Sequence, residues 1–217
     1  SAQRFLKGES AAGEAATEAF FKKNAPNAGV LHLAMHALTN DVDPLYSTLL
    51  FSNPNPADST GENDGFLHAY ELYKLRLGAD LAVLSACNTG AGKVVRGEGI
   101  MSLARAFRFA GCPNVMMSLW SVNDAAAKDL VVGFFQKLSG GMGKAVALQA
   151  AQQDFLKNTK SDELMHPYFW ATFSMVGDDT PVSFAGSRWW IWGLSCLVLG
   201  VIGVFFQYFR VRRSTTK

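Results

Sequence analysis

The sequence predicts an α/β fold with a mostly parallel sheet and helices on both of its faces. Three apolar runs carry this prediction, namely VLHLAM (30–35), LAVLSA (81–86) and VMMSLW (115–120). They lack the alternation of polar and apolar residues found in a strand with one wet face, so we expect both faces to be covered. Helical patterns separate the runs, and strands that alternate with helices form parallel sheets.

Shorter patterns predict further elements before the second run. RFLKG (4–8) is a short strand candidate, and AATEAFFKKN (15–24) predicts a helix that Pro26 ends. A further helix is expected over LHAYELYKLRL (67–77). The segment 52–65, rich in Asn, Pro, Asp and Gly, is the longest without a pattern, and such loops often bind or gate.

The second half of the chain continues the alternation. Its expected elements are a helix over 98–111, a helix from Asn123 or Asp124 to about Leu138, a helix over 144–156 and a strand over 168–177. Gly111 is suited to end the first of these helices, with Pro113 just beyond it.

The run WWIWGLSCLVLGVIGVFFQYF (189–209) carries no charged residue. As a helix it spans the hydrocarbon core of a bilayer, roughly 30 Å, so we expect one transmembrane helix with tryptophans at one end. The tail 210–217 is basic, which favours a cytoplasmic tail and an extracytoplasmic globular domain. A tail anchor inserted after translation would give the opposite orientation.

Composition excludes several classes of protein. The chain has 217 residues, of which 49% are hydrophobic, and a net charge of +2, without the basic stripe of a nucleic-acid binder. Its three cysteines form no CxxC pair, so neither a disulfide framework nor a zinc motif is expected, and no metal or cofactor is implied. The opening SAQRFLKGES has no initiator Met and no signal peptide, which indicates a fragment or a processed chain.

Two short motifs suggest other chemistry, but each lacks residues that its chemistry requires. TGAGK (89–93) lacks the first glycine of a phosphate-binding loop, where Cys87 stands, and its final Ser or Thr, where Val94 stands. HLAMH (32–36) has zincin spacing but no glutamate after His32. We interpret His32 as a core histidine or one that supports a neighbouring site.

His36 and Cys87 follow two of the buried runs. Function in open α/β sheets resides in the loops after the carboxyl ends of the strands, where side chains converge. A lone histidine at a strand end is usually structural, and a lone cysteine is usually a small core residue. Their occurrence together at neighbouring strand ends favours a catalytic pair. Cys112, between Gly111 and Pro113, is interpreted as a structural thiol.

Four blocks resemble the CHAT family of caspase-like peptidases, which is related to caspases and separases. They are VLHLAMHA, DGFLHAYELYKLRL, ADLAVLSACNTGAGKVVRGEGIMSLARAFRFAGCPNVMMSLWSVND and HPYFWATFSMVGD. The resemblance implies a caspase-like α/β sandwich over 1–180, followed by a linker (181–188), the membrane helix and the tail. It also implies a His36–Cys87 dyad acting on a protein or peptide, with a tetratricopeptide-repeat or other sensor module as a possible partner.

The chain departs from the family pattern in two ways. The family usually has Gly after the catalytic histidine, where this chain has Ala37. The backbone N–H groups of Ala37 and Cys87 are expected to form the oxyanion hole, and Ala keeps the N–H while restricting φ. The family domain also normally begins with a strand and a helix upstream of RFLKG, which we expect to be missing here.

Asp124 and Trp120 are the candidates for substrate binding. An acid in this region of the separase relatives suits a basic P1 residue, so Asp124 is a candidate for the S1 pocket. The alternative is that Asp124 only caps the following helix. Trp120 is either a pocket wall or a core residue.

The main hypothesis is therefore a membrane-anchored cysteine endopeptidase. The alternative is a catalytically weak or inactive caspase-like module tethered to the membrane, which Ala37 favours. A different thiol enzyme, such as an acyl transferase, is the third class, although no acyl-donor site is visible in the sequence.

Overall fold

The computed structural model describes residues 5, 8–54, 63–85, 98–121 and 124–182. Several predicted features lie wholly or mostly outside these residues, among them Cys87, RFLKG, the linker 181–188, the span 189–209 and the tail 210–217. Within the described ranges, no helix combines the length and the apolar character needed to cross a bilayer.

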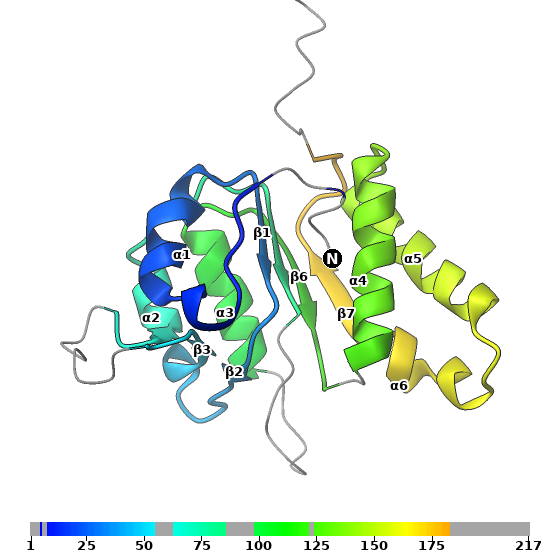
Figure 1. Ribbon diagram of the computed structural model, residues 1–217, viewed down its shortest axis with the longest axis horizontal. Coiled ribbons are helices and arrows are strands. Elements are labelled where there is room, and N and C mark those ends of the chain that lie inside the picture. The colour runs from blue at the N-terminus through cyan, green and yellow to red at the C-terminus, as the bar shows by residue number, and fades with distance from the viewer. Residues whose placement is uncertain (1–4, 6–7, 55–62, 86–97, 122–123, 183–217) are drawn as a thin grey trace, which may run out of the picture. The chain divides into compact units, whose positions relative to one another are not determined.

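A four-stranded sheet forms the centre of the fold (Figure 1). Its strands, in spatial order, are β1 (Val30–Leu33), β5 (Leu81–Leu84), β6 (Asn114–Ser118) and β7 (Phe173–Val176). The first three are parallel and β7 runs antiparallel to β6. The prediction of a mostly parallel sheet is confirmed, and the three apolar runs are its three parallel strands.

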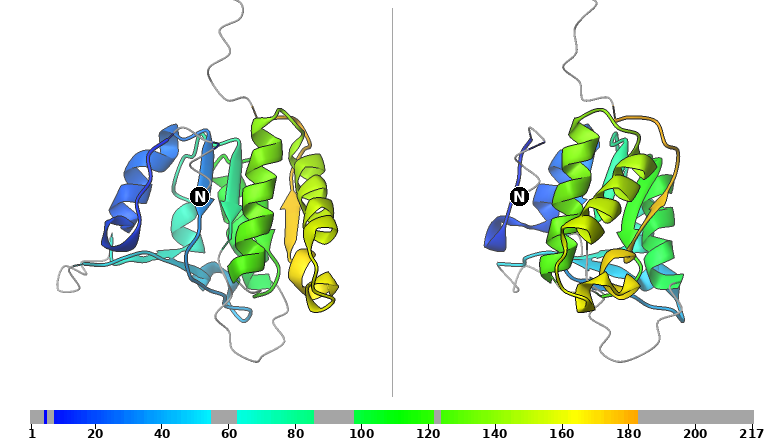
Figure 2. Two further views of the ribbon diagram at one scale, coloured as in Figure 1. Left: turned by 45° about the vertical axis from the view of Figure 1, so that its right-hand side comes forward. Right: turned by 90° about the vertical axis from the view of Figure 1, so that its right-hand side faces the viewer.

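Helices cover both faces of this sheet, as expected (Figures 1 and 2). On one face lie α1 (Glu18–Asn24), α2 (Ala69–Leu72) and α3 (Glu98–Phe109), and on the other lie α4 (Asp124–Ser139) and α5 (Lys144–Asn158). Alternate residues of β5 divide between the two cores: Ala82 and Leu84 pack toward α3, and Leu81 and Val83 toward α4. All four are fully buried. Double coverage therefore explains why this strand lacks a polar face.

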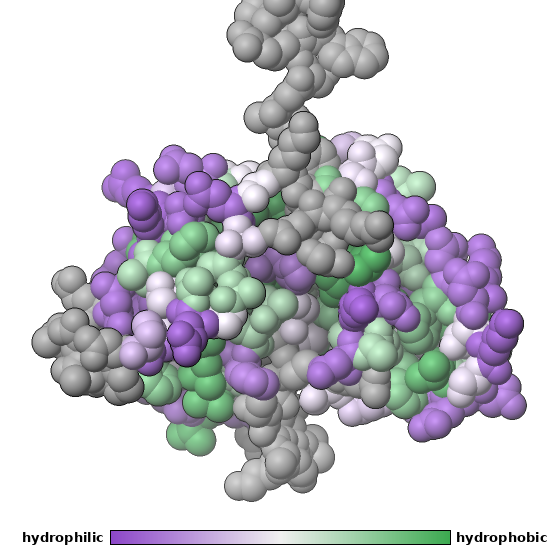
Figure 3. All heavy atoms as spheres, viewed as in Figure 1, coloured by the Kyte–Doolittle hydropathy of each residue, from purple (hydrophilic) through white to green (hydrophobic). Residues whose placement is uncertain are grey.

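The remaining short helices join these elements. They are the 3₁₀ turns η2 (Gly13–Ala15), η3 (Ala25–Asn27), η4 (Pro44–Tyr46) and η6 (Glu163–Met165), and the one-turn helix α6 (Pro167–Trp170). Hydrophilic side chains gather on the outer flanks of the helical layers (Figure 3).

A second, three-stranded antiparallel sheet was not predicted. It consists of β2 (Ala37–Leu38), β3 (Thr48–Leu50) and β4 (Phe66–His68), beside the carboxyl end of β1 (Figure 1). The central row Ala37, Leu49 and Leu67 is buried in the core shared with α3. Strands of two or three residues are too short for a period-2 pattern, so long-range pairing rather than local sequence decides them.

Two predicted elements are wrong in extent. The helix expected over 67–77 is only α2, because Phe66–His68 pairs with β3 and Glu71 accepts a hydrogen bond from the His68 N–H at 2.9 Å. The strand expected over 168–177 begins at Phe173. Its first residues form α6, because Pro167 starts a helix well and the His166 ring accepts from the Tyr168 N–H at 3.2 Å.

A buried lysine closes the amino-end edge of the parallel strands. Lys144 is 0% exposed, and its Nζ lies 3.0 Å from Asp178 Oδ1, 3.3 Å from Asp80 Oδ2 and 2.7 Å from the Thr180 carbonyl. Asn114 continues the cluster by donating to the Asp80 carbonyl at 2.9 Å and accepting from the Asp178 N–H at 2.7 Å. We call these five residues the lysine cluster. They join β5, β6, α5 and the segment after β7.

Candidate active site

The three parallel strands end in one register row. Leu33 of β1 pairs with Leu84 of β5, which pairs with Met117 of β6. In the sequence, His36, Cys87 and Trp120 each follow their own strand's member of this row by three residues. The three strands therefore end at the same edge of the sheet, at matching distances in sequence from these three residues.

His36 lies where the chain passes from β1 to β2, and its side chain is exposed. Its carbonyl accepts a hydrogen bond from the Leu50 N–H at 2.9 Å, so His36 and Leu50 form a bonded pair of the β2–β3 ladder. This contact fixes the backbone of the histidine while leaving its imidazole open to solvent.

Ala37 follows as a buried residue, 1% exposed. It pairs with Leu49, directly after the hydrogen-bonded pair His36–Leu50. Hydrogen-bonded and non-hydrogen-bonded pairs alternate along an antiparallel ladder, so Ala37 and Leu49 form a non-hydrogen-bonded pair, whose N–H groups point away from the partner strand. Since β2 is at the end of the strand order β2–β3–β4, the Ala37 N–H is not used by the described ladder. No described residue other than glycine has a positive φ, so the conformation at this position suits alanine as well as glycine.

Trp120 is a half-buried residue and not part of either core. Its ring stacks on Tyr168 with centroids 6.3 Å apart and an interplanar angle of 22°, and its Nε1–H donates to the Tyr168 carbonyl at 2.8 Å. The Tyr168 hydroxyl donates to the Ser121 carbonyl, and Thr172 Oγ1 donates to the Trp120 carbonyl at 2.9 Å. Residues from α6 and its neighbourhood thus fix the segment that leaves β6.

Asp124 is the first residue of α4, and its side chain is exposed. A carboxylate in the first turn is stabilised by the helix dipole, which agrees with the structural interpretation of this residue. Exposure also leaves it accessible to a substrate, so its position is compatible with both sequence hypotheses.

Cys112 is a fully buried thiol whose Sγ donates to the Asn114 carbonyl at 3.4 Å. Burial raises the pKa of this thiol to about 12, so it carries almost no thiolate at neutral pH. Its environment fits the predicted structural role. Cys87, the predicted nucleophile, lies outside the described residues.

The profile of the CHAT domain matches residues 2–178, which is most of the chain. The chain belongs to the CHAT domain family. CHAT domains belong to the caspase-like cysteine peptidase clan.

Two curated relatives share part of this CHAT domain. Tetratricopeptide repeat protein 28 of Mus musculus is 34% identical over 121 residues, and its Homo sapiens counterpart is 32% identical over 121 residues. Each alignment covers 56% of this chain and 5% of the relative. The chain therefore corresponds to a small part of these long proteins.

Tyr168 is the residue of this edge that sequence reasoning missed. The signal was HPYFW (166–170), in which Pro167 at a first helical position would have indicated a helical turn rather than a strand. Its contact with Trp120 spans 48 residues of sequence, which no local pattern reports.

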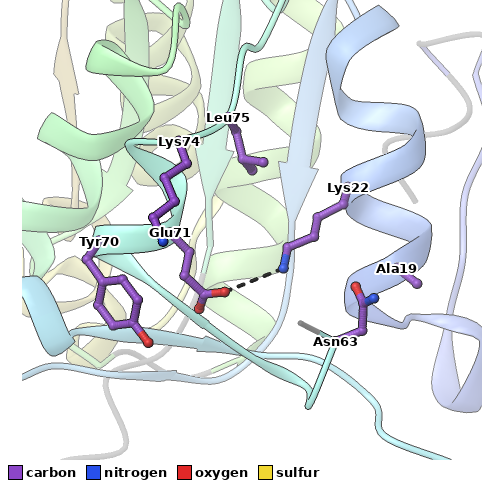
Figure 4. Close-up of a pocket in the computed structure, with 7 residues that line it drawn as sticks. All are labelled: Ala19, Lys22, Asn63, Tyr70, Glu71, Lys74 and Leu75. Atoms are coloured by element: carbon purple, nitrogen blue, oxygen red, sulfur yellow. Dashed lines mark hydrogen bonds and ion pairs between the residues drawn. The ribbon is translucent and has the colours of Figure 1, made fainter. Parts of the chain in front are cut away.

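An open hollow of about 570 Å³ lies away from the predicted site residues of the CHAT domain (Figure 4). It is lined by Ala19, Lys22, Asn63, Tyr70, Glu71, Lys74 and Leu75. Lys22 lies 3.5 Å from Glu71 across it and also pairs with the buried Glu18. The charge of Lys22 is therefore balanced by carboxylates of the protein, and Lys74 lies over the Tyr70 ring, 5.8 Å from its centroid. No three His, Cys, Asp or Glu residues of the described ranges gather closely enough to hold a metal ion.

Proposed function

We propose that this CHAT domain is a cysteine endopeptidase that uses His36 and Cys87 as its catalytic dyad. The observation that carries the proposal is the register row Leu33–Leu84–Met117, from which the chain continues by equal steps to both residues. Family membership supports the same reaction class. The buried, largely neutral Cys112 leaves Cys87 as the better nucleophile of the globular part.

In the proposed mechanism, Cys87 attacks a peptide carbonyl as the thiolate. An ordinary thiol has a pKa of about 8.5 and is only a few per cent ionised at neutral pH, and a nearby imidazole raises this fraction. The C–N bond breaks as His36 gives a proton to the leaving amine, which produces a thioester on Cys87. Water, deprotonated by His36, then releases the carboxylic acid and restores the thiol.

The backbone N–H groups of Ala37 and Cys87 are proposed to bind the oxyanion of this reaction. The direction of the Ala37 N–H, away from β3, supports its share of the role. The extended conformation of β2 also removes the objection that alanine restricts φ. Ala37 therefore no longer favours the alternative of an inactive module.

Asp124 and Trp120 are proposed to bind the P1 side chain. Tyr168 holds the Trp120 ring at the surface and Thr172 holds its backbone carbonyl, so the ring is not buried in a core, as a pocket wall requires. An exposed carboxylate and an indole face together suit an arginine or lysine side chain.

A tagged chloromethyl ketone with arginine at P1 tests the proposed function. We expect a thioether adduct on Cys87, located by peptide mass spectrometry, that Cys87→Ala abolishes and His36→Ala slows by about 10²–10⁴-fold. Cys112→Ala is the matched control and should label like the wild type. A folded protein that gives no Cys87 adduct with electrophiles of several P1 types would support the inactive-module alternative instead.

We further propose that residues 189–209 anchor the domain to a membrane, with the domain on the extracytoplasmic side. The support is the uncharged run and the basic residues after it. Protease protection of an epitope at the C-terminus in sealed vesicles tests the orientation. The names of the curated relatives support a tetratricopeptide-repeat module as a partner.

A further inference from the structure

His32 makes a side-chain bond between the two strands that lead to the proposed dyad. Its Nε2 lies 3.1 Å from Ser85 Oγ, across the β1–β5 ladder. Its ring also packs edge-on against Phe135 of α4, with centroids 5.3 Å apart and an interplanar angle of 62°. The imidazole is therefore held from two sides although part of it remains exposed.

This bond lies at the end of the described pairing between the two strands. The Ser85 N–H donates to the Leu33 carbonyl at 3.1 Å, directly after the final register pair Leu33–Leu84. Ser85 is two residues before Cys87 in the sequence, and His32 is four residues before His36. One backbone bond and one side-chain bond thus define how the chain leaves β5.

The chemistry of the pair suits neutral pH. Loss of hydration in its packed position lowers the pKa of His32, so the imidazole is neutral there. A neutral imidazole has one donor and one acceptor nitrogen, and a serine hydroxyl can take the complementary role with either. The bond therefore needs no charge on His32.

We propose that His32 is a positioning residue, which through Ser85 fixes the direction in which β5 delivers Cys87 toward His36. This inference rests on the proposed function, because it assigns His32 a role in assembling the dyad. A hydrogen bond of this kind contributes about 0.5–1.5 kcal/mol, so its loss should weaken the effect of His36 on Cys87 by roughly threefold to tenfold.

A double-mutant cycle on thiol reactivity tests the proposal without the need for a substrate. The rate of Cys87 alkylation by iodoacetamide at neutral pH is measured by peptide mass spectrometry, with and without His36→Ala, in each background. In the wild-type background we expect His36→Ala to slow alkylation at least tenfold. In the His32→Phe and Ser85→Ala backgrounds, the factor by which His36→Ala slows alkylation should be threefold to tenfold smaller.

Two controls separate positioning from general destabilisation. Phe135→Leu removes the ring contact and keeps the His32–Ser85 bond. It should lower the melting temperature but leave unchanged the ratio of Cys87 alkylation rates measured with and without His36. His32→Gln places an amide nitrogen near the position of Nε2 and should restore the ratio.

The outcomes are distinct. Wild-type ratios in both His32→Phe and Ser85→Ala would overturn the positioning role while leaving the dyad intact. An equal loss of the ratio in Phe135→Leu would also overturn it, because general loosening would then be sufficient. If His36→Ala has no effect in the wild-type background, the dyad itself fails and this inference falls with it.

Discussion

In the proposed mechanism, the residue after His36 supplies a backbone N–H to the developing oxyanion. Ala37 supplies one from the edge of a small sheet, in a conformation that requires no glycine. The sequence alone could indicate this residue only through the family pattern, because the direction of an N–H depends on which strand pairs with it. The β2–β3 register supplies that information.

Ala37→Pro should remove the N–H with little damage to the fold, because proline is tolerated on an edge strand where its nitrogen is outside the ladder. We expect kcat/KM to fall by about 10²–10³-fold. Ala37→Gly keeps the N–H but loses a buried methyl and some backbone order, so it should lower the free energy of unfolding by about 1–2 kcal/mol with nearly unchanged kcat/KM. Peptide hydrolysis and urea unfolding measure the two effects. A folded Ala37→Pro protein with wild-type activity would contradict the oxyanion role.

The structural thiol Cys112 should react slowly in the folded protein. Cys112 is buried and its pKa is raised to about 12, so iodoacetamide near pH 8 should leave it unmodified in the folded protein. It should react at an ordinary rate in urea. Alkylation followed by peptide mass spectrometry measures this difference, and rapid labelling of native Cys112 would show that the thiol is accessible.

At the scale of elements, the prediction was correct for strands that helices cover, because such strands consist almost entirely of apolar residues. The strands β5 and β6 are buried on both faces and appear in the sequence as apolar runs. In β1, Leu31 and Leu33 are buried, whereas His32 on the opposite face is exposed, so the expected coverage of both faces is wrong for this strand. Prediction failed for the segment around Leu67, where Phe66–His68 belongs to a strand within an otherwise helical pattern. Leu67 and Leu72 are both buried, as the pattern predicted, but Leu67 belongs to the strand β4 and Leu72 to the helix α2.

The lysine cluster provides an element-scale prediction. Lys144→Met removes the charge and three hydrogen bonds of a fully buried ammonium group, and the partly exposed Asp80 and Asp178 can then rehydrate. We expect the free energy of unfolding to fall by about 1–3 kcal/mol. Lys137→Met is the matched control, because its pair with Asp154 lies at the surface and should matter little. Urea unfolding of both variants measures the effect, and equal values would contradict the structural role of the cluster.

At the scale of the described domain, the two edges of the sheet have different tasks. The amino-end edge holds the lysine cluster, and the carboxyl-end edge carries His36 and Trp120 on segments that leave β1 and β6. Continuous apolar runs predicted the sheet between them, and the rule on strand ends predicted which edge to search. The charged cluster was not predicted, because Asp80, Lys144 and Asp178 are ordinary charged residues in the sequence and meet only in the fold.

Acid should destabilise the domain, and Asp178 and His32 both contribute to this effect. The pKa of Asp178 is lowered, first by the Thr180 hydroxyl, then by the Thr180 N–H and Lys144, so the unfolded chain takes up this proton first. Its stabilisation is complete above the ordinary value of 3.8 and is lost as the pH falls below it. His32, whose pKa is lowered from 6.5, gives a loss of the same sign that begins at milder acidity. Unfolding free energies against pH should show Asp178→Asn converging on the wild type below about pH 4. A constant difference would contradict this assignment.

The lysine cluster also bears on how this molecule can change over generations. Because the cluster joins β5, β6, α5 and the segment after β7 at one edge, insertions after β1, β5 and β6 at the other edge leave these anchors in place. Loop lengths at that edge can then change without unfolding the sheet. A single residue inserted within β5 would not be tolerated in this way. It would turn the side chains that follow it, such as Ala82 and Val83, to the opposite face of the sheet and so into the wrong core.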